Sequence, residues 1–248
     1  MRIAAMMIAA ALALAGCAPE PQVTATPSMN LTVPAIYNAR VDTGPNGEPL
    51  DIAAIKPAYL ANRNQRAEVA YNGPEAPGTI VVDPYARVLY FVHSPGQATR
   101  YGIAVGRAGT GFAGEGTIQR KARWPSWTPT ANMVSTEPEL YSQFRNGVGG
   151  GLSNPLGSRA LYLYQGGRDT MYRIHGTMDP SSIGKATSAG CIRLFQQDIM
   201  DLFDRIPVGT KVHVRTQGES AAQEGPLVET PDGYMQPAQV VAAAAPAN

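Results

Sequence analysis

The chain has 248 residues, enough for one sizeable domain with flanking segments. Its formal net charge of +1 gives no indication of a nucleic-acid partner or of an acidic one. Only 16% of the residues are charged, and 26 glycines with 21 prolines predict a loop-rich, mainly β chain.

Residues 1–17 have the layout of a bacterial secretory signal. Arg2 supplies the positive charge, and the apolar run that follows is too short to span a membrane. Leu14-Ala15-Gly16-Cys17 resembles a lipobox, in which cleavage leaves Cys17 as a lipid-modified N-terminus; the alternative is an ordinary secretory signal with an incidental cysteine. Ala18 after the cysteine is similar to the pattern of outer-membrane lipoproteins. We therefore expect a domain on the periplasmic side of the envelope, anchored through Cys17 to the outer membrane.

Two segments of biased composition flank the expected domain. Residues 18–76 are rich in Pro, Ala, Asn, Thr and Gly, which predicts a linker, ordered at most in part. Within it, Ile52–Arg66 has the spacing of a short amphipathic helix, although Pro57 argues against one. Residues 217–248 show no periodicity and predict a mobile tail. The folded domain is thus expected over residues 77–216.

From Thr79 onward the pattern changes to that of β-strands. Apolar or alternating runs are separated by Gly, Pro and Asp, as strands are by turns. After Cys191, four apolar residues lie on one face of a helix that Pro207 ends: Ile199, Leu202, Phe203 and Ile206. The predicted strands are 80–82, 88–92, 101–105, 116–120, 159–164, 172–175 and 211–215. The expected fold is mainly β, with one helix after the cysteine.

The segments His175-Gly176-Thr177 and Ser188-Ala189-Gly190-Cys191-Ile192-Arg193 hold the residues of an activated thiol. A thiol becomes a strong nucleophile when a nearby imidazole accepts its proton, so Cys191 is the candidate nucleophile and His175 its base. Gly190 would let the backbone N–H groups of Gly190 and Cys191 face a developing oxyanion. Arg193 is suited to hold a carboxylate and to lower the thiol pKa. A lone cysteine or histidine is more often structural; this combination indicates an acyl-transfer enzyme with an anionic substrate.

Several other residues have both a structural and a functional interpretation. Ser188 would orient the cysteine loop or contact substrate rather than attack. Trp124 and Trp127 would pack in the core or form a flap over the substrate channel. Tyr141 and the glycine-rich run at 147–151 would form a lid or a simple connection.

Metal binding is not expected. His93 and His213 are interpreted as structural, and together with His175 they contain no close pair. Cys191 and His175 would supply only two of the usual four zinc ligands.

The pattern His-Gly-Thr followed by Ser-x-Gly-Cys-Ile-Arg-Leu closely resembles the signature of the L,D-transpeptidase (YkuD-like) catalytic domain, a bacterial peptidoglycan enzyme. Gly151–Leu163 is similar to the family's segment before the catalytic half, and Pro125–Pro129 to its tryptophan-proline loop, so the resemblance covers about residues 77–215. Many members carry histidine at the position of Ala189, a difference that bears on substrate preference more than on chemistry. The resemblance implies a β-sandwich and a backbone carbonyl, that of Gly176, as the group that orients His175.

The resemblance also implies a reaction. Cys191 would attack the L-to-D peptide carbonyl of the diaminopimelate in a tetrapeptide stem, and His175 would protonate the departing D-alanine. The thioester would pass to a second stem, giving a 3→3 cross-link, to an envelope protein, or to water. The implied partners are peptidoglycan stem peptides and the membrane at Cys17, with an envelope protein as one of the acceptors; no cofactor, metal or nucleic acid is implied. Thiol acylation by carbapenem-type β-lactams is a further implication.

Two alternatives remain open at the level of sequence. One is a peptidoglycan amidase or endopeptidase that uses the same Cys191–His175 pair. The other is a catalytically silent wall-binding lipoprotein, against which the presence of both residues argues.

Overall fold

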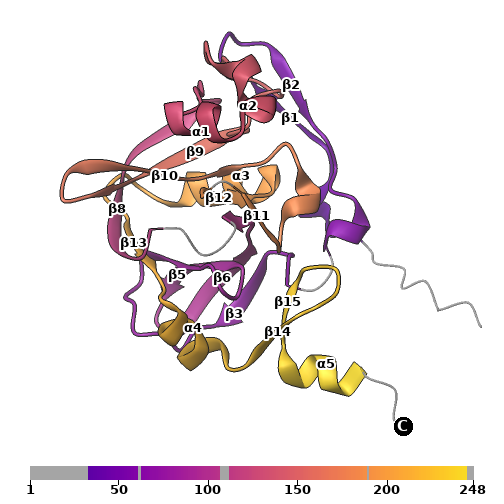
Figure 1. The fold of residues 1–248 in the computed structure, drawn as a ribbon. Helices are drawn as coiled ribbons and strands as arrows, with labels where there is room; N and C mark the ends of the chain where they lie inside the picture. Colours follow the sequence, from indigo (N-terminus) through magenta and orange to yellow (C-terminus); the bar gives the residue numbers. More distant parts are fainter. Residues whose placement is uncertain (1–32, 61–62, 107–111, 189, 245–248) are drawn as a thin grey trace, which may run out of the picture. The chain divides into compact units, whose positions relative to one another are not determined.

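A computed structural model describes residues 33–60, 63–106, 112–188 and 190–244, apart from the side chains at positions 140, 188 and 244. The predicted signal segment lies outside this part of the chain. In the described part, nine strands form one large sheet in the order β12-β10-β9-β8-β13-β4-β5-β6-β3 (Figure 1). The pairs β10·β12 and β13·β4 are parallel, and the other neighbours in this sheet are antiparallel.

The strands of the large sheet confirm the expected mainly β fold. They are β3 (Ala67–Ala70), β4 (Thr79–Asp83), β5 (Val88–Ser94), β6 (Gln97–Gly102), β8 (Gly114–Arg123), β9 (Arg159–Gln165), β10 (Arg168–Gly176), β12 (Ile192–Leu194) and β13 (Lys211–Val214). The run expected over 101–105 is divided, because β6 ends at Gly102 and the two-residue β7 (Val105–Gly106) pairs instead with β11 (Ala186–Ser188).

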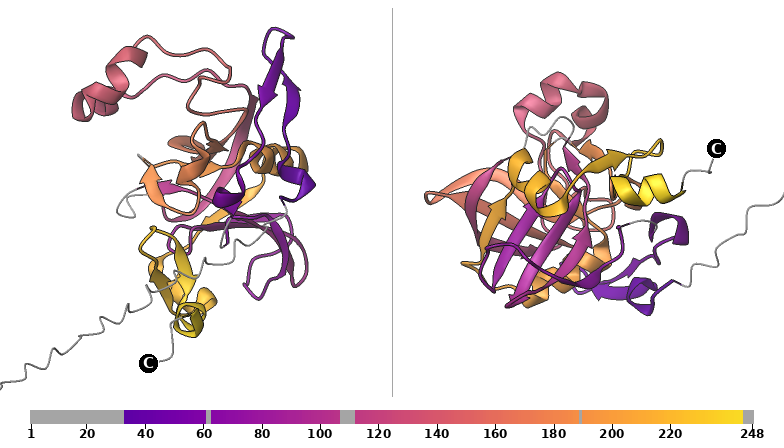
Figure 2. Two further views of the ribbon diagram at one scale, coloured as in Figure 1. Left: turned by 90° about the vertical axis from the view of Figure 1, so that its right-hand side faces the viewer. Right: turned by 90° about the horizontal axis from the view of Figure 1, so that it is seen from below.

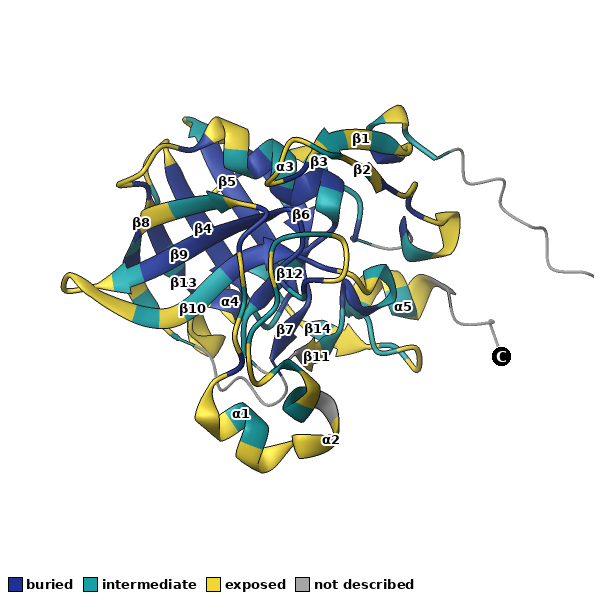
Figure 3. Ribbon diagram, turned by 90° about the horizontal axis from the view of Figure 1, so that it is seen from above, coloured by how far each residue is buried: buried dark blue, intermediate teal, exposed yellow. Residues whose placement is uncertain are grey.

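The sheet folds over one hydrophobic core, which gives the expected sandwich. Ile80 and Leu89 from one half of the sheet share a cluster of buried side chains with Leu161 and Ile174 from the other half. Strand β4 has both faces covered, because Val81, between its two core-facing neighbours, belongs to a second cluster. Figure 3 shows buried residues running along β4, β5 and β9. The continuous β-branched run of β4 is typical of a strand covered on both faces.

Helix α3 (Gln196–Arg205) is the predicted helix after the cysteine. It packs on β9 and β10 and buries Ile199 and Leu202 in the main core, as the spacing of its apolar residues predicted. The ammonium of Lys121 on β8 donates to the carbonyl of Phe203 at 2.5 Å, near the end of the helix. This bond satisfies a carbonyl that has no partner within the helix.

A helical excursion lies between β8 and β9. It contains α1 (Ala131–Thr136), α2 (Pro138–Tyr141) and the 3₁₀ turn η4 (Ser142–Phe144), seen as the rose-coloured coils of Figure 2. The hydroxyl of Thr130 caps α1 by accepting from the backbone N–H of Met133 at 3.2 Å.

The described part of residues 18–76, expected as a linker that is ordered at most in part, is folded. Besides β3 at the edge of the large sheet, it holds η1 (Ala35–Tyr37), the paired strands β1 (Arg40–Thr43) and β2 (Pro49–Ile52), and η2 (Pro57–Leu60). No long helix covers 52–66 in the described residues; η2 begins at Pro57 instead. The side chains of Tyr37 and Leu60 are almost fully buried. Single buried residues of this kind produce no periodic pattern in the sequence.

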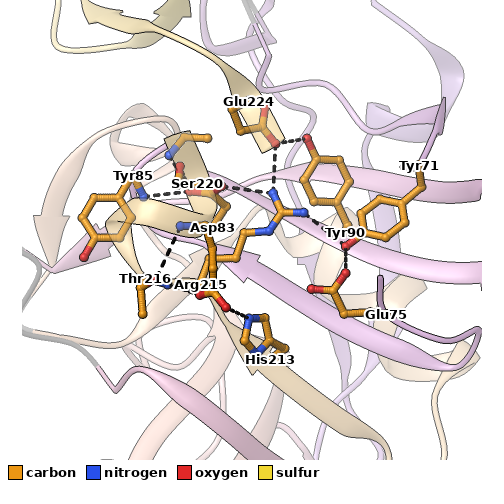
Figure 4. Close-up of polar contacts among 12 residues, drawn as sticks. Tyr71, Glu75, Asp83, Tyr85, Tyr90, His213, Arg215, Thr216, Ser220 and Glu224 are labelled. Atoms are coloured by element: carbon orange, nitrogen blue, oxygen red, sulfur yellow. Dashed lines mark hydrogen bonds and ion pairs between the residues drawn. The ribbon is translucent and has the colours of Figure 1, made fainter. Parts of the chain in front are cut away.

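Residues 217–244, expected as part of a mobile tail, are also folded. They form α4 (Gln217–Glu224), the hairpin of β14 (Leu227–Glu229) and β15 (Met235–Pro237), and α5 (Ala238–Ala244). A buried polar network holds α4 to the sheet (Figure 4). Arg215, 2% exposed, pairs with Asp83 and with Glu224 at 3.2 Å each, and Ser220 donates to Asp83 at 2.8 Å. Removing α4 would leave the Arg215 guanidinium with fewer acceptors in a buried site.

Asp42 on β1 joins the N-terminal segment to the large sheet. Its carboxylate accepts from Arg159 at 2.7 Å, from the indole of Trp124 at 2.8 Å and from Arg123 at 3.0 Å. Burial raises the pKa of Asp42, but hydrogen bonds and charge from Arg159, with the bond from Trp124, lower it overall. The Arg159 guanidinium is 2% exposed, so it depends on this carboxylate for its charge balance.

We predict that Asp42→Ala lowers the free energy of unfolding by about 3 kcal/mol, because it leaves the buried guanidinium of Arg159 without its carboxylate partner. Urea unfolding followed by tryptophan fluorescence measures this value. The matched control is Asp51→Ala on β2, whose exposed side chain should contribute within about 0.5 kcal/mol. A loss below about 1 kcal/mol for Asp42→Ala would contradict the assignment of Asp42 as the anchor of the N-terminal segment.

Candidate active site

The parallel pairing of β10 and β12 brings His175 and Cys191 together. In this register Ile174 lies opposite Ile192, and His175 lies opposite Arg193. Both isoleucines point into the main core. Since side chains alternate along a strand, His175 and Arg193 project from the other face, and so does Cys191, which immediately precedes β12. The thiol and the imidazole thus share one face of two adjacent strands.

The imidazole of His175 is held in one orientation. Its Nδ1 lies 2.6 Å from the carbonyl oxygen of Gly176, so Nδ1 carries the proton and donates, and Nε2 remains the basic nitrogen. Burial lowers the pKa of His175 to about 4, and the charge of Arg193 adds to this effect, while the backbone of Gly176 and Leu156 opposes it. The contact expected between Gly176 and His175 is therefore present, and the imidazole is neutral at pH 7.

The loop that covers His175 is shaped by Asn154, which the sequence reading missed. Asn154 is fully buried; its amide donates to the carbonyls of Pro125 at 2.9 Å and Gly149 at 3.0 Å, and its carbonyl accepts from the N–H of Leu156 at 2.9 Å. The signal for it was the Asn-Pro dipeptide inside the glycine-rich stretch, which marks a turn. Asn154 thereby connects the glycine-rich run at 147–151 to the loop that contains Leu156, through the backbone carbonyls of that run.

Gly190 adopts a backbone conformation that suits glycine, with φ of 137°. Burial raises the pKa of the Cys191 thiol, while a backbone hydrogen bond from Arg173 and the charges of Arg173 and Arg193 lower it less. The expectation that Arg193 makes the thiol acidic is therefore only half right: its charge acts in that direction, but burial outweighs it. The thiol and the imidazole are therefore both neutral at pH 7.

Arg173 is a second cation near the thiol. Both of its terminal nitrogens bind the carboxylate of Asp169, at 2.6 and 2.9 Å, and its guanidinium lies 4.3 Å from the centre of the Tyr162 ring. These contacts fix the guanidinium in place, so its charge acts on Cys191 from a constant position.

Arg193 lies two residues after Cys191 and opposite His175 in the register. Its guanidinium donates to the hydroxyl of Thr187 at 2.7 Å. Burial lowers its pKa, and the charges of Asp179, Cys191 and Tyr141 oppose this, which places all three within electrostatic range of Arg193.

Trp127 and Trp124 have different surroundings. Trp127 is partly exposed and packs its ring against Tyr141 and Phe144 at 6.2 and 5.8 Å between centroids, so it belongs to the helical excursion beside the site. Trp124 is buried, and its indole donates to Asp42. Of the two predicted roles, it therefore has that of a core-packing residue.

The remaining predicted residues divide into described and undescribed ones. The backbone of Ser188 ends β11, but its side chain, like Ala189 and Cys17, lies outside the described part. His93 contacts Glu68 and His213 contacts Glu115, each at 2.7 Å and away from Cys191, which agrees with structural roles. Within the described ranges, no cluster of His, Cys, Asp and Glu is arranged to hold a metal ion. No helix in the same ranges has the length and apolar character needed to cross a bilayer.

A buried imidazole with Nδ1 bound to a carbonyl, on the same face as a thiol that immediately precedes the next strand, is an arrangement that can activate a cysteine nucleophile. A family model described as the L,D-transpeptidase catalytic domain matches residues 77–214. The chain belongs to this family, and the predicted family and enzyme class are confirmed.

Named relatives agree with this assignment. The chain is 35% identical over 140 residues to a putative L,D-transpeptidase in the ATP synthase subunits region (ORF 5) of Fuscovulum blasticum, covering 54% of this chain and 68% of that protein. It is 36% identical over 142 residues to the probable L,D-transpeptidase ErfK/SrfK of Escherichia coli K12, covering 56% of this chain and 44% of that protein. The chain thus spans less than half of the second relative.

A solved structure from Brucella melitensis shares 48% sequence identity, covering 61% of this chain and 94% of that one, with a TM-score of 0.44. It is described as a probable carnitine operon oxidoreductase CaiA, whereas the family model and both relatives above are described as L,D-transpeptidases.

The neutral state of the pair leads to a pH prediction. Alkylation of Cys191 by iodoacetamide should rise about tenfold per pH unit from about pH 6 to 9, with its midpoint above the ordinary thiol value of about 8.5, because burial disfavours the thiolate. Mass spectrometry of the peptide that contains Cys191 measures the rate, with glutathione as the reference thiol. A plateau already reached below pH 7 would instead show a preformed thiolate and imidazolium.

Proposed function

We propose that this chain is a cysteine-dependent L,D-transpeptidase that acts on peptidoglycan stem peptides through a thioester on Cys191. The observation that carries the proposal is the thiol and the oriented imidazole on one face of β10 and β12. The family assignment supports the substrate class, since the family model describes L,D-transpeptidases.

The first step follows from the protonation states. Because His175 is neutral above about pH 4, its Nε2 can accept the thiol proton as Sγ bonds to the carbonyl carbon. The carbonyl electron pair moves to oxygen, and the backbone N–H groups of Gly190 and Cys191 are the proposed donors to that oxyanion. When the pair returns, the C–N bond breaks, and the imidazolium gives its proton to the departing amine of D-alanine. The thioester remains on Cys191.

The substrate side of the site is proposed to recognise a carboxylate. Arg193 presents a guanidinium near Tyr141 and beside the thiol, which suits an anionic stem peptide. Trp127 and Ser188 are proposed to contact the stem as well. The second step repeats the first in reverse: His175 removes a proton from the acceptor, and the acceptor displaces Sγ. The proposed acceptors are the amine of another stem, giving a 3→3 cross-link, or the amine of an envelope protein.

We further propose that the domain is anchored through Cys17 and works on the periplasmic side of the outer membrane. Leu14-Ala15-Gly16-Cys17 supports this proposal, because its pattern is similar to a lipobox.

Anchoring predicts that the whole chain, expressed in a Gram-negative host, partitions with the outer-membrane fraction and yields an N-terminal peptide carrying acyl chains on Cys17. Cys17→Ala should move the protein out of the membrane fraction while iodoacetamide still labels Cys191. Recovery of the unsubstituted protein in the soluble periplasmic fraction would contradict the proposal.

The proposed reaction predicts a transient mass adduct. The whole chain is incubated with a tetrapeptide muropeptide, with and without excess amine acceptor, and followed by intact-mass spectrometry. We expect release of D-alanine, an adduct on Cys191 and, with acceptor, a cross-linked dimer. Tripeptide monomer in place of dimer would indicate that water is the acceptor, as in a peptidase. No adduct and no D-alanine from folded protein would overturn the proposal.

Matched variants separate chemistry from folding in this experiment. Cys191→Ala and His175→Gln should lose the adduct, with a rate reduced at least about 10³-fold, while circular dichroism stays unchanged. His213→Gln is the control histidine, because its ring contacts the exposed Glu115 and Glu219 rather than the site. It should keep the rate within about twofold.

A further inference from the structure

Gln196, the first residue of α3, joins two chain segments whose backbone interacts with the imidazole of His175. Its Nε2 donates to the carbonyl of Thr177 at 2.9 Å, and its Oε1 accepts from the N–H of Ser158 at 2.9 Å. One side chain therefore satisfies a carbonyl just after β10 and an N–H just before β9. Neither bond is part of the sheet or of the helix.

The surrounding chain makes room for this amide. A Cβ added at Gly157 would lie 2.4 Å from the Nε2 of Gln196, and one added at Gly176 would lie 2.3 Å from its Oε1. Real Cβ atoms do not approach other atoms this closely. Gly157 also has φ of +64°, where other residues are strained. The two glycines thus form a slot that the Gln196 amide fills.

Both segments that Gln196 holds also contribute backbone to His175. The carbonyl of Gly176, which accepts from Nδ1, directly precedes Thr177. Leu156, whose backbone also acts on the imidazole, lies two residues before Ser158. The position of these backbone groups decides which ring nitrogen carries the proton.

From this geometry we propose that Gln196 is a positioning residue for His175: by binding Thr177 it holds the adjacent Gly176 carbonyl in place, so that Nδ1 is protonated and Nε2 remains the base. The role assigned to Nε2 rests on the proposed function, whereas the orientation itself does not. A carboxamide suits the place because it donates at one end and accepts at the other. A carboxylate of the same shape has no donor for the Thr177 carbonyl.

The adjacent residue supplies a matched control. Gln197 is 1% exposed and lies in the same turn of α3. Its Nε2 donates to the carbonyl of Ala53 at 2.9 Å, in the N-terminal segment rather than in the site. Loss of either glutamine removes a hydrogen-bonded amide from α3, but only Gln196 contacts the segments beside His175.

The test compares Gln196→Ala, the isosteric Gln196→Glu and Gln197→Ala in the whole chain. The readout is the ¹⁵N NMR shift of the His175 ring nitrogens, assigned by comparison with His175→Gln. At pH 7 the wild-type protein and Gln197→Ala should show one tautomer with a protonated Nδ1. The Gln196 variants should show a mixture, and muropeptide acylation should fall about 10- to 100-fold for them but stay within about twofold for Gln197→Ala.

The outcomes are separable. A folded Gln196→Ala or Gln196→Glu protein with an unchanged single Nδ1–H tautomer overturns the inference, whatever its activity. An equal loss of tautomer order in Gln197→Ala also overturns it, because the effect would then belong to the helix as a whole. If the wild-type protein forms no acyl-enzyme, the proposed function fails, and the tautomer comparison still decides the role of Gln196.

Discussion

The parallel pairing of β10 with β12 is the contact on which the site depends. Strands one residue out of register would turn Cys191 or His175 into the core, because side chains alternate along a strand. Ile174 and Ile192 prevent this slip: both are buried in the main cluster, and they lie opposite each other in the register. The hydrophobic core thus sets the geometry of the two reactive side chains on the opposite face.

The second constraint is the burial of the pair. It raises the pKa of the thiol and lowers that of the imidazole, so both groups are neutral in the resting state. A neutral pair avoids the cost of two separated charges in a site with little water. The cations of Arg173 and Arg193 then oppose the effect of burial on the thiol.

The third constraint involves segments outside residues 77–214, the part matched by the family model. Asp42 balances the buried Arg159, and Glu224 pairs with the buried Arg215. Tyr37, in the N-terminal segment, donates to Asp198 on α3 at 3.1 Å. The helix that carries Gln196 is thus braced by residues that precede the matched region. These flanking segments belong to the folded unit that holds the site.

The sequence by itself determined most strands of the large sheet from Thr79 onward, the amphipathic helix after the cysteine and the association of His175 with Cys191. Each of these has a local signal: an apolar run, a helical period or a motif of reactive residues at short separation. Periodicity works for these elements because they bury a continuous face.

Only the tertiary structure decided that the flanking segments are folded, that Cys191 and His175 are neutral at rest, and which groups Asn154 and Gln196 contact. The described residues in 33–60, 63–76 and 217–244 are held by single buried residues and ion pairs. Tyr37, Asp42 and Glu224 are examples, and their partners lie far away in the chain. No local pattern encodes such partners. The pKa of Cys191 also depends on how deeply the fold buries the thiol. Burial raises this pKa by more than the charges of the nearby arginines lower it, and the sequence shows the arginines but not the burial.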